Sequence, residues 1–255
     1  PESVEAIGRD AFRYCTGEVI VNCNIPSASS YSRGVFYDSD FSIITIGGGV
    51  AAIGDYAFYN CNNLVSVTLP GGLRSIGNSS FKGCNRLTSI DIPKDVAEIG
   101  NNAFNGCSSL TSVAIPDGVT SIKNETFSGC SKLNTVNLPK DITEIGANAF
   151  SSCYSLSSLD IPESVISIGE YAFYYCSNLL SVTLPNGVAS ISEYAFYGCE
   201  NLASITLPEG VATIGSNAFS CCYSLSSIDI PNNVTSIGDY AFNQCRSLTS
   251  IVIPK

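Results

Sequence analysis

Apolar residues recur along this chain at fixed positions of a 23-residue unit, and Ser, Thr, Asn and charged residues fill the positions between them. Three apolar columns run through nine successive units without a break. The cysteines run from Cys61 to Cys245, the phenylalanines from Phe58 to Phe242 and the isoleucines from Ile53 to Ile237. One such unit is too short to bury its own apolar side chains, so the pattern predicts a solenoid in which stacked units share a core.

The repeats extend over nearly the whole chain, with one irregular stretch. The first unit keeps Ile7, Phe12 and Cys15, and Cys15 precedes Cys61 by two periods. Between them, around residues 16–40, the pattern is degenerate and can be recognised only at residues 34–39. We therefore predict one solenoid over residues 1–255, built from about eleven 23-residue repeats, with the degenerate repeat around 16–40. A chain that starts without Met and stops inside a repeat is expected to be a fragment of a longer protein.

Within a unit the pattern predicts two kinds of local structure. Residues 64–70 end in a period-two alternation of apolar and polar side chains, which indicates a short strand with one buried face, and Pro70 ends it. Ile99, Ala103 and Cys107 are spaced as one helical or turn-like segment would require. The predicted fold class is therefore an α/β repeat solenoid, a curved array with a parallel β-sheet on its concave face and short helical or irregular segments on its convex side.

Composition and charge narrow the function classes. Hydrophobic residues make up 45% of the chain and charged residues 13%, which favours a folded chain throughout. A net charge of -10 opposes non-specific binding to nucleic acid or to anionic membranes. No apolar stretch approaches the roughly 18 to 20 residues of a membrane span, so this segment is not expected to insert into a membrane directly. The chain has no His, which removes the commonest general base and metal ligand and argues against an enzyme.

The remaining reactive groups also fit structural positions. Asp91, Asp160 and Asp229 share a strand position three repeats apart, so neighbours would be separated by roughly 14 Å, too far for a two-carboxylate hydrolase. The nine regularly spaced cysteines are expected to be free, buried thiols. No Cys-x-x-Cys occurs, so neither a metal nor a cofactor is predicted. Two other features need checking: Cys221 as an exposed thiol, and Cys15 with Cys23 as an off-column pair.

The repeat sequence itself carries a resemblance. Segments such as Cys-Asn-Arg-Leu-Thr-Ser-Ile-Asp-Ile-Pro, starting at Cys84 and followed by Val-x-x-Ile-Gly-x-x-Ala-Phe, resemble BspA-type leucine-rich repeats. That resemblance implies a leucine-rich-repeat array on a surface-exposed or secreted protein that adheres to host matrix proteins or to other cells. It implies an extracellular or cell-surface binding module for a protein or a glycan, without enzymatic activity. The alternative is a structural spacer or self-assembly scaffold.

Two sets of residues are candidates for binding. The first is the polar side of the strands, which the resemblance favours, and the second is a group of tyrosines on the opposite wall, where amphipathic aromatic side chains suit an interface. These tyrosines could equally shield the edges of the coils. The candidate residues are Ser158, Asp160, Ser181, Thr183, Ser204 and Thr206 on the strands, and Tyr171, Tyr174, Tyr194 and Tyr197 on the opposite wall.

Overall fold

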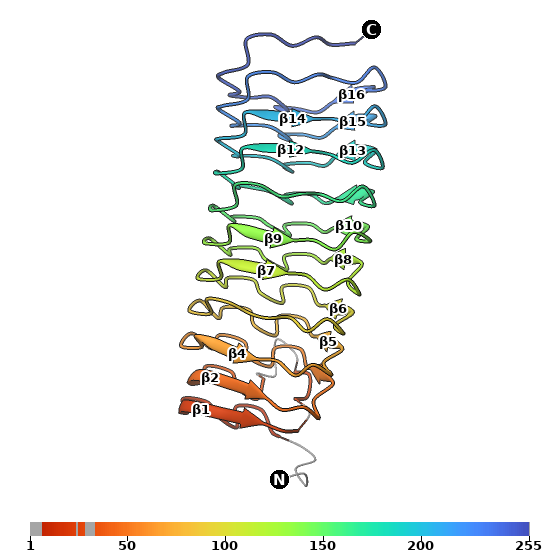
Figure 1. The fold of residues 1–255 in the computed structure, drawn as a ribbon. Helices are drawn as coiled ribbons and strands as arrows, with labels where there is room; N and C mark the ends of the chain where they lie inside the picture. Colours follow the sequence, from red (N-terminus) through yellow and green to blue (C-terminus); the bar gives the residue numbers. More distant parts are fainter. Residues whose placement is uncertain (1–6, 24, 29–33, 255) are drawn as a thin grey trace.

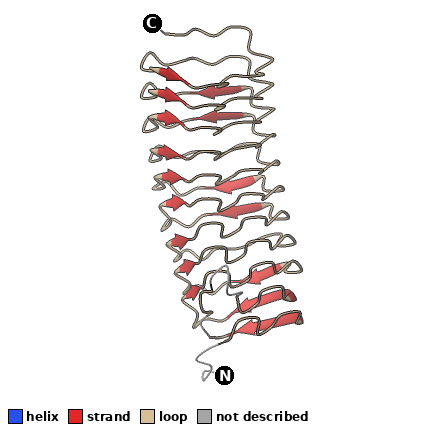
Figure 2. Ribbon diagram, turned by 180° about the vertical axis from the view of Figure 1, so that it is seen from behind, coloured by secondary structure: helices blue, strands red, loops and turns tan. Residues whose placement is uncertain are grey.

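The chain winds into an elongated column of stacked coils, with its two ends at opposite ends of the column (Figure 1). The structure is a computed structural model that describes residues 7–23, 25–28 and 34–254. Each regular coil runs through a first strand position, a corner, a second strand position and a wall of turns (Figure 2). The described residues contain strands and turns but no helix, so the expected helical segments are wrong.

The first strand position forms a column of parallel strands along one side of the stack. Its central residue is buried and the residues on either side of it are exposed, as in Ser181, Val182 and Thr183. This is the strand that the period-two alternation predicted. The column consists of β1 (Thr16–Val21), β2 (Asp40–Ile46), β4 (Ser66–Thr68), β7 (Ser112–Ala114), β9 (Thr135–Asn137), β12 (Ser181–Thr183) and β14 (Ser204–Thr206).

The second strand position forms another parallel column, which the sequence pattern did not reveal. Each of its strands is only two residues long, too short for an alternation to be recognised. Ile145 lies opposite Ile122 on one side and Ile168 on the other, so equivalent residues of successive repeats face each other. The column consists of β3 (Ala52–Ile53), β5 (Ser75–Ile76), β6 (Glu98–Ile99), β8 (Ser121–Ile122), β10 (Glu144–Ile145), β11 (Ser167–Ile168), β13 (Ser190–Ile191), β15 (Thr213–Ile214) and β16 (Ser236–Ile237).

The first column is interrupted at every third coil. In the described part of the chain, the coils of Asp91 and Asp160 form no strand at the first position, and the coil of Asp229 forms only an isolated bridge to Val252 there. The neighbouring coils that do pair have Thr, Ala or Asn at the same position. The three carboxylates thus coincide with the breaks in the first column.

The turn wall replaces the expected helix for a reason visible in its hydrogen bonds. Asn102 and Gly106 have positive φ angles of 57° and 74°, which an α-helix does not allow. Alternate N–H groups therefore point in different directions. The N–H groups of Asn102, Phe104 and Gly106 donate to carbonyls of the next coil, whereas that of Cys107 donates to Phe104 three residues back. Half of the wall's hydrogen bonds thus close turns and half join neighbouring coils.

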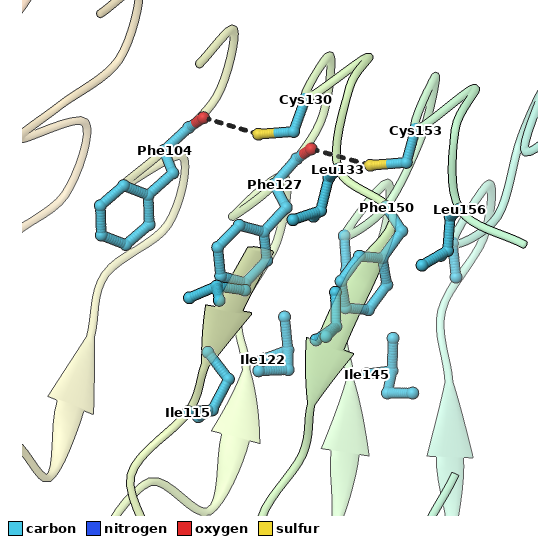
Figure 3. Close-up of a cluster of buried hydrophobic side chains, with 14 of the residues drawn as sticks. Phe104, Ile115, Ile122, Phe127, Cys130, Leu133, Ile145, Phe150, Cys153 and Leu156 are labelled. Carbon is cyan, nitrogen blue, oxygen red and sulfur yellow. Dashed lines mark hydrogen bonds between the residues drawn. The ribbon is translucent and has the colours of Figure 1, made fainter. Parts of the chain in front are cut away.

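The core is a set of ladders that run along the column (Figure 3). Successive phenylalanine rings stack with their centroids 5.0–5.7 Å apart, from Phe12 to Phe242. Beside them each ladder cysteine donates its thiol hydrogen to the carbonyl of the phenylalanine in the preceding coil, as Cys153 does to Phe127 at 3.2 Å. Burial of these side chains is what holds the coils in register.

The degenerate repeat keeps the core but not the regular spacing. Phe36 lies in the phenylalanine stack, 5.1 Å from Phe12 and 5.0 Å from Phe58. Buried Ser39 takes the place of the ladder cysteine, with its hydroxyl 3.4 Å from the Cys61 sulfur. Strands β1 and β2 pair in parallel with a register shift between Gly17 and Glu18, which accommodates the change of phase.

Candidate binding surfaces

The six strand-side candidates lie together on one exposed face, which we call the hydroxyl face. Ser181 and Thr183 on β12 lie opposite Ser204 and Thr206 on β14, and all four are exposed. Ser158 and Asp160 are also exposed, in the adjacent coil, which has no strand at the first position. This face consists of short hydroxyl side chains with one carboxylate. It lacks the aromatic and Arg side chains that usually carry the binding energy of an interface.

A shallow hollow marks one of the breaks in the first strand column. It has a volume of about 240 Å³ and lies between the coil of Asp91 and strands β7 and β9. Asp91 is the only ionisable side chain in its lining. The hollow therefore offers hydrogen-bonding groups but no second carboxylate or base for catalysis.

The four predicted tyrosines form one cluster on the turn wall, and the structure adds a fifth, Tyr175. The rings of Tyr171 and Tyr194 stack with centroids 4.6 Å apart, and those of Tyr174 and Tyr197 stack at 5.2 Å. Edge contacts join the two stacks, with Tyr171 and Tyr174 at 5.4 Å. We call these five residues the tyrosine edge. All five are partly exposed, whereas the phenylalanines behind them are buried.

Tyr175 was missed because its column is otherwise occupied by Gly, Ser or Cys in the nearest coils. Its ring packs over Gly198, where an added Cβ would lie only 2.6 Å from a ring carbon. It also contacts the rings of Tyr174 and Tyr197, at 4.6 and 5.5 Å. The one signal in the sequence was the Tyr-Tyr pair before Cys176, which no other repeat contains.

Three members of the tyrosine edge have the left-handed backbone conformation that recurs along the turn wall. Tyr171, Tyr175 and Tyr194 have φ angles of 58°, 55° and 54°. A bulky side chain in this left-handed region is disfavoured by roughly 1–2 kcal/mol, whereas Asn tolerates it well. At the equivalent position of the coils on either side, Asn148 and Asn217 adopt the same conformation. The backbone alone would therefore favour Asn, and tyrosine is present despite it.

The cluster perturbs the ionisation of its own phenols. Burial, together with Tyr194 and the carboxylates of Glu193 and Glu170, raises the pKa of Tyr171. A hydrogen bond with the Cys221 thiol, together with burial, raises the pKa of Tyr197. Cys221 was expected to be an exposed thiol, but it is only partly exposed and lies beside this phenol. The phenols of Tyr171 and Tyr197 therefore remain protonated, neutral donors throughout the physiological pH range.

The surroundings of the tyrosine edge carry charge of one sign. All ten charged side chains between residues 141 and 245 are Asp or Glu, and no Lys or Arg occurs there. Exposed Glu170 and Glu193 directly precede Tyr171 and Tyr194 in the chain. The first half of the molecule is different, because it also carries cations, some of which pair with carboxylates, as Lys123 does with Glu98 and Arg74 with Asp95.

The same edge of the earlier coils carries an amide ladder, which consists of Asp55, Asn78, Asn101 and Asn124. Each side-chain oxygen accepts the backbone N–H of its counterpart in the next coil, at 2.6, 2.8, 3.1 and 2.9 Å in turn. The last acceptor, Asn124, binds the N–H of Ala147, which has no side-chain oxygen to continue the ladder. In the following coils Glu170 and Glu193 occupy this column.

The cysteines offer no reactive site. All twelve are free thiols, so Cys15 and Cys23 are not bridged. Burial raises the pKa of Cys107, Cys153 and Cys199 well above the usual value, so these thiols stay protonated and poorly nucleophilic. Over residues 7–23, 25–28 and 34–254, no three His, Cys, Asp or Glu side chains gather in a way that could hold a metal. No described segment forms a helix of the length and apolar character needed to cross a membrane.

Comparison with known proteins identifies the repeat. The family model for the BspA type leucine rich repeat region matches residues 1–111, 97–193 and 167–255. A leucine rich cell surface protein of Faecalibacterium prausnitzii is similar over 94% of this chain and 82% of its own, with 30% identity and a TM-score of 0.61. A leucine-rich repeat protein of Bacteroides ovatus is similar over 91% of this chain and 86% of its own, with 25% identity and a TM-score of 0.50.

A third structure, the pneumococcal vaccine antigen PcpA, shares the fold, with 20% identity, a TM-score of 0.64, and coverage of 98% of this chain and 74% of its own. Among curated proteins, no sequence matches this chain. The family model covers the chain from end to end, and the match to the F. prausnitzii protein extends over most of both chains. This chain belongs to the BspA-type leucine-rich repeat family.

Proposed function

We propose that this protein is a non-enzymatic, cell-surface or secreted binding module, and that its tyrosine edge is the surface that recognises a macromolecular partner. The observation that carries this proposal is the cluster of five tyrosines in mutual contact, which lies outside the buried core. Tyr is enriched at interfaces because one ring provides apolar contact area and a hydrogen-bonding hydroxyl together.

The backbone conformation of the cluster supports a role beyond folding. The solenoid accepts Asn at the positions of Tyr171 and Tyr194 in neighbouring coils, and Asn suits the left-handed conformation better. The tyrosines are therefore dispensable for the backbone of the turn wall. The left-handed conformation recurs in every regular coil, so this edge is distinguished by the presence of Tyr in place of Asn rather than by the conformation itself.

The surface location is proposed by similarity. The F. prausnitzii relative, at 30% identity over most of both chains, is described as a cell surface protein. Leucine-rich repeat proteins typically bind proteins, and nothing in the tyrosine edge or the hydroxyl face forms a catalytic constellation. We therefore favour a protein partner, such as a host matrix or cell-surface protein, over a glycan, and the hydroxyl face as a secondary contact.

The decisive experiment compares three proteins on arrays of extracellular matrix proteins and of glycans. The first is the unaltered chain. The second carries Tyr171→Asn, Tyr194→Asn, Tyr174→Ser and Tyr197→Ser, each of which installs a residue that the same column already holds in an adjacent coil, and we call it the column variant. The third carries Ser158→Ala, Asp160→Ala, Ser181→Ala and Thr183→Ala on the hydroxyl face.

We expect the unaltered chain to bind a partner, the column variant to lose that binding and the hydroxyl-face variant to retain most of it. Thermal unfolding of all three proteins checks that the fold is intact. Binding that survives in the column variant but not in the hydroxyl-face variant would move the site to the strands. A chain that binds no partner on either array would instead support a spacer or self-assembly scaffold.

A further inference from the structure

The charge around the tyrosine edge limits the kind of partner that it fits. Glu170 and Glu193 are exposed beside the two stacks, and the nearest Lys or Arg in the sequence on either side are Lys140 and Arg246. Carboxylates with no cation in the same stretch of chain leave a negative local field. The field favours a positively charged partner and disfavours an anionic one.

The geometry of the tyrosine edge suits a planar cation. Each stack contains only two rings, so the outward face of each end ring points toward a neighbouring coil. The equivalent residues there are Asn148 and Asn217 for one stack, and Ser151 and Ser220 for the other. These side chains are too short to cover a phenol ring. Aromatic faces attract cations through the ring quadrupole, and a guanidinium group can also stack flat on them.

The molecule itself shows this contact at two other tyrosines. The guanidinium carbon of Arg246 lies 4.7 Å from the centre of the Tyr223 ring, and that of Arg13 lies 4.5 Å from the centre of the Tyr14 ring. Tyrosines of the turn wall therefore accept arginine when the chain provides it nearby. At the tyrosine edge the chain provides carboxylates instead.

We propose that the tyrosine edge binds an arginine-containing, basic segment of a partner protein, with guanidinium groups stacked on the open ring faces and paired with Glu170 and Glu193. This proposal rests on the proposed function and names the class of its partner. Guanidinium groups on both open faces of the Tyr171–Tyr194 stack would lie roughly 12 Å apart. An extended peptide spans roughly 13 Å in four residues and places side chains four residues apart on the same side, so arginines spaced as Arg-x-x-x-Arg fit best.

The test uses the whole chain and the heptapeptide Gly-Arg-Gly-Gly-Gly-Arg-Gly, capped at both ends. The protein has 13 tyrosines and no Trp, so tyrosine fluorescence detects binding, its loss in the column variant assigns the signal to this edge, and calorimetry gives the affinity. The comparison peptides replace both arginines with lysine or with citrulline, which keeps the shape of arginine without its charge. We expect the arginine peptide to bind more tightly than the lysine peptide, and the citrulline peptide to bind at least tenfold more weakly than the arginine peptide.

Variants then separate stacking from simple charge attraction. The column variant should bind the arginine peptide about tenfold or more weakly, since it lacks four of the rings. Glu170→Gln with Glu193→Gln should weaken it several-fold and reduce its dependence on salt. The matched control changes the other tyrosine pair, with Tyr56→Asn and Tyr59→Ser, and should leave the affinity within about twofold.

Two results would overturn the proposal. Equal binding of the arginine and citrulline peptides would show that charge is not recognised. Equal binding of the arginine peptide to the unaltered chain and the column variant would show that only the net negative charge attracts it. Either result would leave the proposed function standing if a protein or glycan on the arrays still lost binding in the column variant, and would reassign only the class of partner.

Discussion

The amide ladder and the tyrosine edge occupy the same wall of the solenoid, above the same core. In the amide ladder, each side-chain oxygen is already bonded to the backbone of the next coil. In the tyrosine edge, the rings contact one another while Glu170 and Glu193 remain exposed beside them. One edge uses its polar groups to join coils and the other presents them outward. The comparison teaches that the buried ladders set the fold, which leaves the turn wall free to vary.

The largest expected effect is the loss of stability at high pH, which tests whether the same thiol ladder lies under both regions. Burial raises the pKa of seven ladder thiols, from Cys84 to Cys222, above the usual value near 9.0, so the native chain keeps these protons after the unfolded chain has lost them. Stability contributed by these thiols is complete below pH 9 and falls as the pH rises above it. Above pH 9, each thiol should lower the free energy of unfolding by about 1.4 kcal/mol per pH unit. Urea unfolding between pH 7 and 10.5 measures this loss.

Cys153→Ser provides the control for that titration. Ser39 shows that a hydroxyl fits the cysteine position, so the variant should fold and lose the contribution of one thiol to the pH dependence. Stability that does not change between pH 8 and 10.5 would contradict the interpretation. So would rapid reaction of the native ladder thiols with a thiol reagent at pH 8.

Truncation of one ring in each region is the next largest test. Phe104→Ala under the amide ladder and Phe173→Ala under the tyrosine edge should each lower the free energy of unfolding by about 3–5 kcal/mol, because both rings are fully buried between two others. Denaturant unfolding measures both. A difference between them much larger than about 1 kcal/mol would mean that the two edges contribute unequally to the core.

Substitutions in the amide ladder and in the tyrosine edge should have smaller effects on stability, and these effects should differ between the two. Asn101→Ala removes the acceptor of the Asn124 N–H and should cost about 0.5–1.5 kcal/mol. Glu193→Ala at the equivalent position of the tyrosine edge should change the stability by less than about 0.5 kcal/mol, because the carboxylate is exposed. Equal losses from both substitutions, in the same unfolding assay, would remove the distinction between a bonded edge and an outward-facing one.

The smallest expected effect on stability is also the most informative about function. Tyr171→Asn should relieve the left-handed strain and lose the stack with Tyr194, and these two contributions are of similar size and opposite sign. The melting temperature should therefore stay within a few degrees of that of the unaltered chain. A loss of several kcal/mol would show that the tyrosine edge is part of the structural framework.

Sequence periodicity predicted the stack, the first strand column and the buried cysteines, because each of these depends on side chains that recur in every coil. It did not predict the features that depend on the backbone conformation. The wall around Asn102 and Gly106 has the residue spacing of a helix, but their positive φ angles make it a series of turns. The two-residue strands are too short to show an alternation, and Tyr175 belongs to the cluster through its packing over Gly198 and its contacts with the rings of Tyr174 and Tyr197.

The candidate tyrosines could be selected from their columns, but their contacts could not. Periodicity places Tyr171 and Tyr194 one coil apart, which is compatible either with two separate side chains or with a stack. Only the structure shows rings 4.6 Å apart and nearly parallel. Likewise, the outward position expected for Cys221 followed from its place beside a buried residue, and its contact with Tyr197 depends on a side-chain conformation that spacing does not define.

The thiol ladder determines how the protein responds to oxidation. Successive cysteines lie one coil apart, and each is occupied by a hydrogen bond to a phenylalanine carbonyl, as Cys130 is to Phe104 at 3.2 Å (Figure 3). While the coils stay closed, oxidants and other thiols cannot reach these sulfurs. Once the coils open in an oxidising medium, the same chain exposes a closely spaced series of thiols that can form wrong disulfides. The lifetime of the folded protein in such a medium is then set by its unfolding rate rather than by its free energy of unfolding.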